Sequence, residues 1–261
     1  MNETRTSESI EATLRAAGER LSGYDLAAAG QAILADGADL FFTVDSSLGK
    51  LYVGYGTGGI KYVTPCAEDG WDFSRRYGEM FGRLVVPQEE GASDGLRGLV
   101  RRALAGERVE VPLDLSGRTE FQRRVLKVVE DIPRGEVRSY GWVAGEAGRP
   151  RASRAVGTIM ANNPVPLIVP CHRVIRNDGS PGSYGFEPEK KVRLLRDEGV
   201  PLEEVVRALY VATPTTGIVC HTTCRHARRI KPENRRPFKN LNSALGSGFR
   251  PCKVCRPAVA A

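Results

Sequence analysis

The chain has 261 residues, of which 41% are hydrophobic and 26% are charged, so it can bury a core and should divide into two or three small domains. No apolar run reaches the length of a membrane-spanning helix, and the first ten residues are polar, so the composition excludes a membrane protein and predicts neither a signal peptide nor an anchor. We therefore expect a cytoplasmic protein.

The net charge of +7 is concentrated at the carboxy-terminal end. Residues 206–261 carry eleven Lys or Arg and one Asp or Glu, whereas residues 1–100 carry nine and fifteen. A solvated basic tail is one interpretation, but the glycines, prolines, aromatic residues and paired cysteines of this segment favour a folded module. Its charge indicates a polyanionic partner, and nucleic acid is the expected one.

The amino-terminal half predicts an α+β scaffold domain over residues 38–115. It follows a helical extension, residues 1–37, to which no role is assigned. Alternating residues in 41–45 and 50–55, around a turn at 46–49, predict a hairpin, and 60–63 adds a third strand. Helical segments are expected at 73–81 and 96–105, and an extended segment at 109–113 closes the domain.

The next domain, residues 116–204, changes to helices. Thr119 and Gln122 fit a capping box at the start of a helix whose apolar stripe reaches Ile132. Short helices at 140–147 and 151–160, joined through a glycine-containing turn, predict a helix-turn-helix. An ordinary helical hairpin is the commoner alternative. Three arginines near the start of the second helix favour contact with a nucleic-acid groove: Arg149, Arg151 and Arg154.

Cys171 and His172 lie at the end of an apolar run that predicts a strand. Adjacent side chains of a strand point to opposite faces, so proton transfer from Cys171 to His172 is expected to pass through a water molecule. Glu198 ends a helix predicted for 187–198, where the helix dipole disfavours a carboxylate by about 0.3 to 1 kcal/mol. A local partner should compensate that cost, although a solvated helix-end acid is equally compatible with the position.

Several segments together resemble one family. Residues 170–174 (Pro-Cys-His-Arg-Val), Ser139 with Tyr140, residues 151–157 and residues 194–199 are similar to the active-site pattern of the O6-alkylguanine-DNA alkyltransferases. The resemblance implies that Cys171 takes a methyl group from O6-methylguanine in double-stranded DNA, once per molecule, in a monomer without an organic cofactor. It also implies a relay from Cys171 through His172 to Glu198.

The same resemblance assigns further roles one residue at a time. Asn163 ties the recognition helix to the cysteine segment, Tyr140 protonates the departing guanine, and Arg154 enters the stack when the base is flipped out. Arg151 and Arg173 are assigned to DNA contact. The expected pocket wall consists of Pro166, Val174, Gly182 and Tyr184. This chain departs from the family at Phe186, where many relatives have glycine, so the pocket should be narrower and bulky alkyl groups less well accepted.

Four cysteines form two close pairs near the carboxy terminus, and Cys66 has no assigned role. The spacing of Cys220 and Cys224, and of Cys252 and Cys255, predicts one zinc ion held by four thiolates, with His221 and His226 as alternatives for one ligand. Residues 215–220 and 248–255 resemble the metal-binding domain of the Ada adaptive-response protein, which implies a zinc domain over 208–258. In that family the residue matching Cys220 also accepts methyl groups from methylphosphotriesters. A purely structural zinc site is the simpler alternative.

Three other functions remain open at this point. One is a methylation-sensing transcriptional regulator that uses the zinc domain, although no room remains for the regulatory helices that follow this domain in Ada. A second is a protein that binds damaged DNA without repairing it, which the cysteine at position 171 disfavours. A third is a cysteine hydrolase, for which a basic helix has no evident use.

Overall fold

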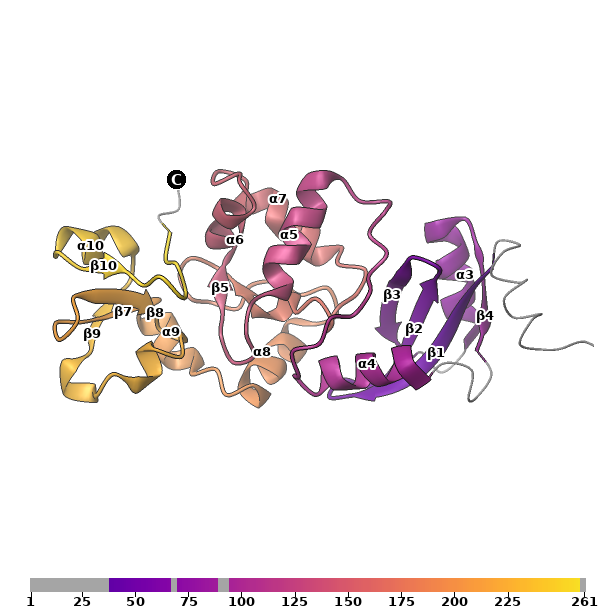
Figure 1. The fold of residues 1–261 in the computed structure, drawn as a ribbon, viewed down its shortest axis with the longest axis horizontal. Coiled ribbons are helices and arrows are strands. Elements are labelled where there is room, and N and C mark those ends of the chain that lie inside the picture. Colours follow the sequence, from indigo (N-terminus) through magenta and orange to yellow (C-terminus); the bar gives the residue numbers. More distant parts are fainter. Residues whose placement is uncertain (1–37, 67–69, 89–93, 259–261) are drawn as a thin grey trace, which may run out of the picture.

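The computed structural model describes residues 38–66, 70–88 and 94–258. Its elements form three successive parts along the long axis of the molecule (Figure 1): an amino-terminal sheet with two helices, a central helical part, and a second small sheet near the carboxy terminus. The expected mixed α+β class is confirmed. The helices predicted for residues 1–37 lie outside the described residues.

The first sheet has four strands in the order β3-β2-β1-β4. Its strands are β1 (Ala38–Ser46), β2 (Gly49–Gly56), β3 (Gly59–Pro65) and β4 (Leu84–Pro87). The predicted hairpin and third strand are confirmed, with Val44 opposite Leu51 in the antiparallel β1 and β2 pair. Strand β4 was not predicted because four residues are too few for a clear alternation, and it pairs in parallel with β1 after an intervening helix.

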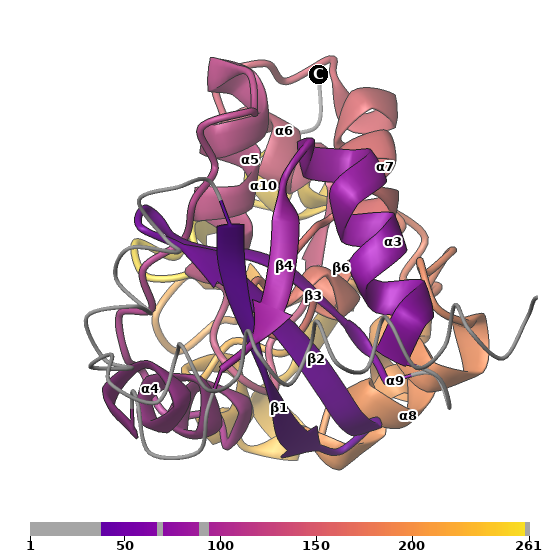
Figure 2. The same cartoon turned by 90° about the vertical axis from the view of Figure 1, so that its right-hand side faces the viewer.

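The two faces of this sheet bury different side chains. Phe73 and Tyr77 of α3 (Gly70–Phe81) pack with Phe41 and Tyr52 on the outer face, which is turned away from the central part (Figures 1 and 2). The neighbouring Phe42 points the other way, into a core that includes α4 (Asp94–Leu104) and the central helices. Because successive side chains of β1 point to opposite faces of the sheet, Phe41 packs with α3 while Phe42 packs with the central helices and holds the sheet against them.

Five helices and a two-stranded pairing make up the central part. They are α5 (Glu120–Glu130), β5 (Arg138–Ser139), α6 (Tyr140–Glu146), α7 (Ser153–Ala161), β6 (Val174–Ile175), α8 (Pro188–Asp197) and α9 (Leu202–Arg207). The capping box at Thr119 and Gln122 is confirmed by both of its hydrogen bonds. Helices α6 and α7 pack against each other as two short helices joined by a turn. The second begins at Ser153, two residues after the predicted start.

The predicted strand around Cys171 is wrong. Cys171–Arg173 form a single turn of 3-10 helix, η1, and only the next two residues, in β6, pair with a neighbouring strand. Three prolines, at positions 164, 166 and 170, remove the backbone donors that a strand would use. Leu167 adopts a φ of 70°, which turns the chain sharply before the cysteine. The run is apolar because it is buried, not because it is extended.

The carboxy-terminal sheet has the strand order β10-β8-β7-β9. Its elements are β7 (Tyr210–Thr213), β8 (Ile218–His221), the 3-10 turns η2 (Ala227–Arg229) and η3 (Pro232–Asn234), β9 (Arg236–Phe238), α10 (Leu241–Gly246) and β10 (Arg250–Pro251). Leu209 and Val219 of this part share one core with Leu195 of α8 and Val205 of α9. The two parts are therefore packed together and are not separated by a free linker.

No helix within the described ranges is long and apolar enough to cross a membrane.

Candidate functional site

Cys171 lies where two cavities meet beneath the surface. The residue is only 3% exposed, and cavities of about 280 and 370 Å³ both reach it. Met160, Ala161 and Tyr184 line both cavities with it. A sulfur in this place can react only with a group that enters a cavity from outside.

Asn163 joins the end of α7 to the segment that leads into Cys171. Its side-chain amide donates to the Val169 carbonyl at 2.9 Å, and the Val165 N–H donates to its oxygen at 3.1 Å. It also forms a hydrogen bond to the Cys171 sulfur that favours the thiolate. The Asn163 side chain therefore holds the backbone of the segment that leads into Cys171 and also contacts the Cys171 sulfur.

His172 and Glu198 form a buried pair next to the cysteine. Nε2 of His172 lies 3.0 Å from Oε1 of Glu198, and both side chains are less than a tenth exposed. The local partner expected for Glu198 is therefore present. The Gly135 N–H also donates to Oε2 of this carboxylate at 3.0 Å.

Arg173 requires a correction, because the sequence analysis assigned it to DNA contact. Its guanidinium instead donates to both oxygens of Glu198, at 2.7 and 2.9 Å, and to the Ile132 carbonyl at 2.6 Å. The side chain is 12% exposed. An arginine whose donors are used by one buried carboxylate and one carbonyl stabilises that carboxylate and is not presented to a phosphate.

These contacts set the protonation states of the relay. Burial would raise the pKa of Glu198, but the hydrogen bonds and positive charges of His172 and Arg173 outweigh it and hold the pKa well below its usual range. Burial lowers the pKa of His172, the hydrogen bond and charge of Glu198 oppose that shift, and the charges of Arg173 and Lys191 add to it, so the pKa stays below its usual value. At neutral pH the pair is a neutral imidazole beside an ionised carboxylate.

The tautomer of His172 follows from this pairing. Because the carboxylate can only accept, the proton of the imidazole lies on Nε2. Nδ1 is then a bare acceptor, and it is buried with no hydrogen-bond partner among the described residues. This is the nitrogen available to take a proton from the cysteine.

Cys171 needs such an acceptor. Burial raises the pKa of its thiol, although the hydrogen bond from Asn163 and the charge of Lys191 act in the opposite direction. The resting group is therefore a thiol at neutral pH, and a nucleophilic thiolate forms only if a base removes the proton.

Lys191 is a site residue that the sequence analysis missed. Its ammonium group is buried and donates to the carbonyls of Val174 and Ser183, at 2.6 and 3.3 Å. Burial lowers the pKa of Lys191 to about 8, and the neighbouring Cys171 opposes this shift. A signal was present in the sequence, since Lys191 occupies a core position of α8, on the same stripe as Leu194 and Leu195.

The predicted pocket wall is only partly assembled. Pro166 and Tyr184 line the cavities at Cys171, and Phe186 stands against Tyr184 at a ring separation of 5.4 Å. Val174 and Gly182 line neither of these cavities. Val174 is fully buried behind Cys171 and contributes its carbonyl to Lys191, while Gly182 packs against Arg176.

The three remaining predicted residues lie on or beside the two short helices. Tyr140 begins α6 and lines the larger cavity, and burial raises the pKa of its hydroxyl. Arg151 and Arg154 are exposed at the start of α7. They are free to approach a partner at this surface, in contrast to Arg173.

The four paired cysteines come together in the carboxy-terminal part. Their sulfur atoms all lie within 4.8 Å of one another, and all four residues are buried. Tetrahedral zinc with Zn–S distances of about 2.3 Å places its ligands about 3.8 Å apart, so this set fits the ion. His221 and His226 are not part of the cluster, which leaves the two predicted cysteine pairs as the ligand set.

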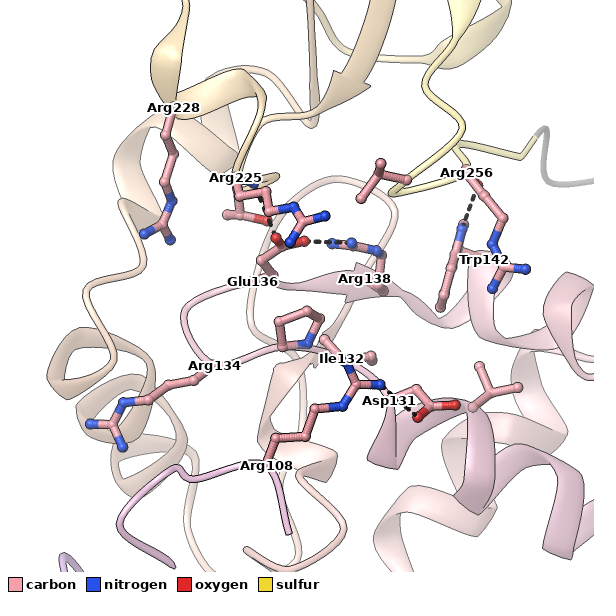
Figure 3. A pocket seen from close by; sticks show the side chains of 14 residues that line it. Arg108, Asp131, Ile132, Arg134, Glu136, Arg138, Trp142, Arg225, Arg228 and Arg256 are labelled. Carbon is pink, nitrogen blue, oxygen red and sulfur yellow. Dashed lines mark hydrogen bonds and ion pairs between the residues drawn. The ribbon is translucent and has the colours of Figure 1, made fainter. Parts of the chain in front are cut away.

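The carboxy-terminal part docks against the segment that links α5 to α6. Figure 3 shows this junction, where a cleft of about 460 Å³ is lined by arginines from both sides. Five hydrogen bonds join the two sides. They run from Val137 N–H to Thr223 Oγ1, from the Thr223 hydroxyl to the Val137 carbonyl, from Arg225 N–H to Glu136 Oε1, from the Arg228 guanidinium to the Gly135 carbonyl, and from Trp142 Nε1 to the Arg256 carbonyl. Nothing in the sequence pattern indicated this contact.

Comparison with known proteins gives two family matches and several relatives. Residues 120–200 match the model "6-O-methylguanine DNA methyltransferase, DNA binding domain", and residues 203–258 match "Metal binding domain of Ada". A methylated-DNA–protein-cysteine methyltransferase of Mycobacterium tuberculosis is 39% identical over 158 residues, which cover 60% of this chain and 90% of that protein. One from Methanothermobacter thermautotrophicus is 50% identical over 91 residues, or 35% of this chain and 51% of that protein.

A solved structure agrees with these matches. The crystal structure of an OGT variant from Mycobacterium tuberculosis superposes with a TM-score of 0.50 at 34% identity, covering 61% of this chain and 92% of that one. The matched 61% of the 261 residues is more than residues 116–258 contain together, so the similarity includes part of the α+β scaffold.

Proposed function

Because this chain belongs to the methylated-DNA–protein-cysteine methyltransferase family, we propose that it repairs O6-methylguanine in double-stranded DNA by moving the methyl group to its own Cys171. The observation that carries the proposal is the buried sulfur at the meeting point of two cavities, with a neutral histidine and an ionised carboxylate directly behind it. Family membership gives the class of reaction, and the positions of Cys171, His172 and Glu198 suggest the order of its steps.

The proposed reaction is a displacement at the methyl carbon. His172 takes the Cys171 proton on Nδ1 through one water molecule, and Glu198 stabilises the imidazolium that forms. The thiolate attacks the methyl carbon, an S–C bond forms, and the bond between the methyl carbon and O6 breaks. The guanine leaves with those electrons and gains a proton, which we assign to Tyr140. Lys191 lowers the free energy of the thiolate by its charge.

The proposed reaction occurs once per molecule. Regeneration would require a nucleophile to take the methyl group from the thioether and release the Cys171 thiolate, and no group in the site is proposed to do so, so the thiol is not regenerated. In a time course with excess methylated duplex, repair should stop at one lesion per protein chain. Continued turnover after that point would contradict the single-turnover proposal.

Arg154 is proposed to fill the space left by the flipped nucleotide. The lesion inside a duplex cannot reach a buried sulfur unless the base leaves the stack. Arg154→Ala should therefore slow repair of duplex DNA by about tenfold or more and leave transfer from free O6-methylguanine base nearly unchanged. Single-turnover rates on the two substrates test this, with Arg101→Ala as the control because it removes an exposed arginine from α4. Equal losses on both substrates would exclude the role.

The four-cysteine cluster is proposed to hold one zinc ion. Bound zinc would keep the four sulfurs as thiolates, which remain nucleophilic without a separate base. We propose that Cys220 is a second methyl acceptor for methylphosphotriesters, and that exposed arginines of this domain, such as Arg225 and Arg236, hold the neighbouring phosphates.

A variant lacking the first acceptor isolates this second activity. Cys171→Ala protein, loaded with zinc, should gain one methyl group from duplex DNA that contains methylphosphotriesters and no O6-methylguanine. Peptide mass mapping should place it on Cys220. Unmodified duplex is the control, and a folded, zinc-loaded variant that gains no methyl group would reduce this domain to a structural or DNA-binding role.

The remaining assignments are proposals of the same kind. A methylation-sensing regulator is the alternative function, and it would need the same methyl transfer to Cys220. We propose a monomer, because one chain supplies every residue of both sites. The domain limits 38–115, 116–204 and 208–258, and a cytoplasmic location, also stay predictions.

A further inference from the structure

Gly135 is held from two sides by residues of different domains. Its N–H donates to Oε2 of Glu198 at 3.0 Å, and its carbonyl accepts a hydrogen bond from the guanidinium of Arg228. Glu198 in turn holds Nε2 of His172. A continuous set of hydrogen bonds therefore runs from the carboxy-terminal domain to the imidazole beside Cys171.

The backbone at position 135 leaves no room for a side chain. Its φ is +74°, which favours glycine, and a Cβ atom here would lie 2.8 Å from the Glu198 carbonyl oxygen and 3.0 Å from the Arg228 guanidinium. The residue is buried. Only glycine therefore fits between the two partners, and one peptide backbone bonds to both of them.

Arg228 is itself anchored to the metal-binding cluster. It belongs to η2, four residues after Cys224, and its own N–H donates to the Cys224 carbonyl at 3.0 Å. The preceding Ala227 is fully buried against the cysteines. The nearby Arg225 N–H donates to the buried side chain of Glu136, so the same loop also binds the residue that follows Gly135.

We propose that Arg228 is a positioning residue for methyl transfer at Cys171. By holding the Gly135 backbone, it keeps the amide that donates to Glu198 in place, and through Glu198 it keeps the imidazole of His172 in its productive tautomer and orientation. The metal-binding domain thereby supports the chemistry of the other acceptor site. This inference rests on the relay described under the proposed function.

An arginine in a DNA-binding protein also invites a simpler assignment, a contact with a DNA phosphate. The two assignments differ in the substrate that reveals them. A phosphate contact affects only duplex DNA, whereas a defect in the relay slows transfer from the free methylated base as well.

The test compares Arg228→Ala with Arg229→Ala, which removes the same charge from the same turn. Among the described residues, the Arg229 side chain forms no hydrogen bond or ion pair with the segment 135–142, and it does not line the cleft at the junction. We expect Arg228→Ala to slow transfer from free O6-methylguanine about tenfold, in line with the loss of a group that supports a reactive side chain. Arg229→Ala should keep the wild-type rate on the free base. Arg228→Lys, which retains a donor, should recover part of the rate.

An NMR measurement of the His172 ring distinguishes loss of its positioning from general loss of folded structure. The chain has only three histidines, so nitrogen NMR of labelled protein resolves the His172 ring once its signals are identified with His172→Gln. In wild-type protein the proton should lie on Nε2, and in Arg228→Ala the tautomers should be mixed. Zinc content and thermal unfolding of each variant show whether the carboxy-terminal domain is intact. If that domain is not folded in Arg228→Ala, the same rate and tautomer are measured in Arg228→Lys.

The outcomes are distinguishable. A wild-type rate and tautomer in Arg228→Ala, or a loss confined to duplex DNA, would overturn the positioning role while leaving the proposed function in place. A wild-type protein that transfers no methyl group at all would overturn the proposed function and this inference with it.

Discussion

Replacing Glu198 with glutamine should slow methyl transfer by about a hundredfold, the lower range for loss of general acid–base assistance. The amide cannot stabilise the imidazolium of His172, and its N–H₂ group, itself a donor, could not accept the hydrogen bonds that Gly135 and Arg173 now donate to the carboxylate. Single-turnover rates on O6-methylguanine duplex measure the effect. DNA affinity should stay near wild type, because Glu198 is buried and contacts no surface group.

A nearby carboxylate supplies the control. Asp197 is exposed and pairs only with Arg193 at 3.8 Å, so Asp197→Asn should leave the rate unchanged. If Glu198→Gln lost DNA affinity in the same proportion as rate, or if both variants slowed equally, Glu198 would be a structural residue and the relay would be excluded.

The same substitution should change stability as well as rate. It leaves the Arg173 guanidinium, 12% exposed, without its ionic partner, and breaking such a buried pair costs about 3 to 5 kcal/mol. The pKa of Glu198 is lowered in the folded protein, so its contribution is present above the unfolded pKa of about 4.3 and is lost as pH falls through the folded value. Denaturant unfolding of Glu198→Gln should accordingly show a weaker loss of stability on acidification than the wild type.

Removal of zinc should unfold the carboxy-terminal domain. The residues packed directly around the cluster are few, namely the buried Val211 and Ala227 and the partly buried Ile218 and Ile230, so little apolar area is available to hold four buried thiols together. Apparent binding free energies of structural zinc sites are about 10 to 16 kcal/mol, more than this core can replace. Hydrogen exchange after chelation should show loss of protection over 208–258.

The effect should spread to the docked segment, because five hydrogen bonds and a shared core join it to this domain. Cys224→Ser should reproduce the loss of protection. Cys66→Ser, which changes a cysteine outside the cluster, should bind zinc and exchange like the wild type. Unchanged protection over 208–258 after complete chelation would show that zinc does not hold the domain together.

The parts of this molecule that could be predicted from sequence are those set by local chemistry. The capping box at Thr119 needs only two side chains at fixed spacing, and the cysteine pairs carry the spacing of a metal site in themselves. The hairpin of β1 and β2 follows from alternation around a turn. The helix-end position of Glu198 was equally compatible with a solvated acid, so its pairing with His172 was predicted only from the family resemblance.

The rest depends on tertiary contacts that no local pattern records. The apolar run 165–171 has the composition of a strand, but its prolines lack the backbone donors of a strand and Leu167 turns the chain with a positive φ, so that it leads into η1. Arg173 looks like a DNA contact until Glu198, 25 residues away, takes up its donors. The contact of Arg228 with Gly135 joins residues 93 apart. Such pairings are fixed by packing, which one sequence does not display.

The most direct test of the account is the intact mass of the protein after incubation with duplex DNA containing O6-methylguanine, followed by peptide mapping. The account predicts a gain of one methyl group per chain, located on Cys171, and no gain in Cys171→Ala on the same DNA. A methyl group on any other residue, or an equal gain in Cys171→Ala, would contradict it.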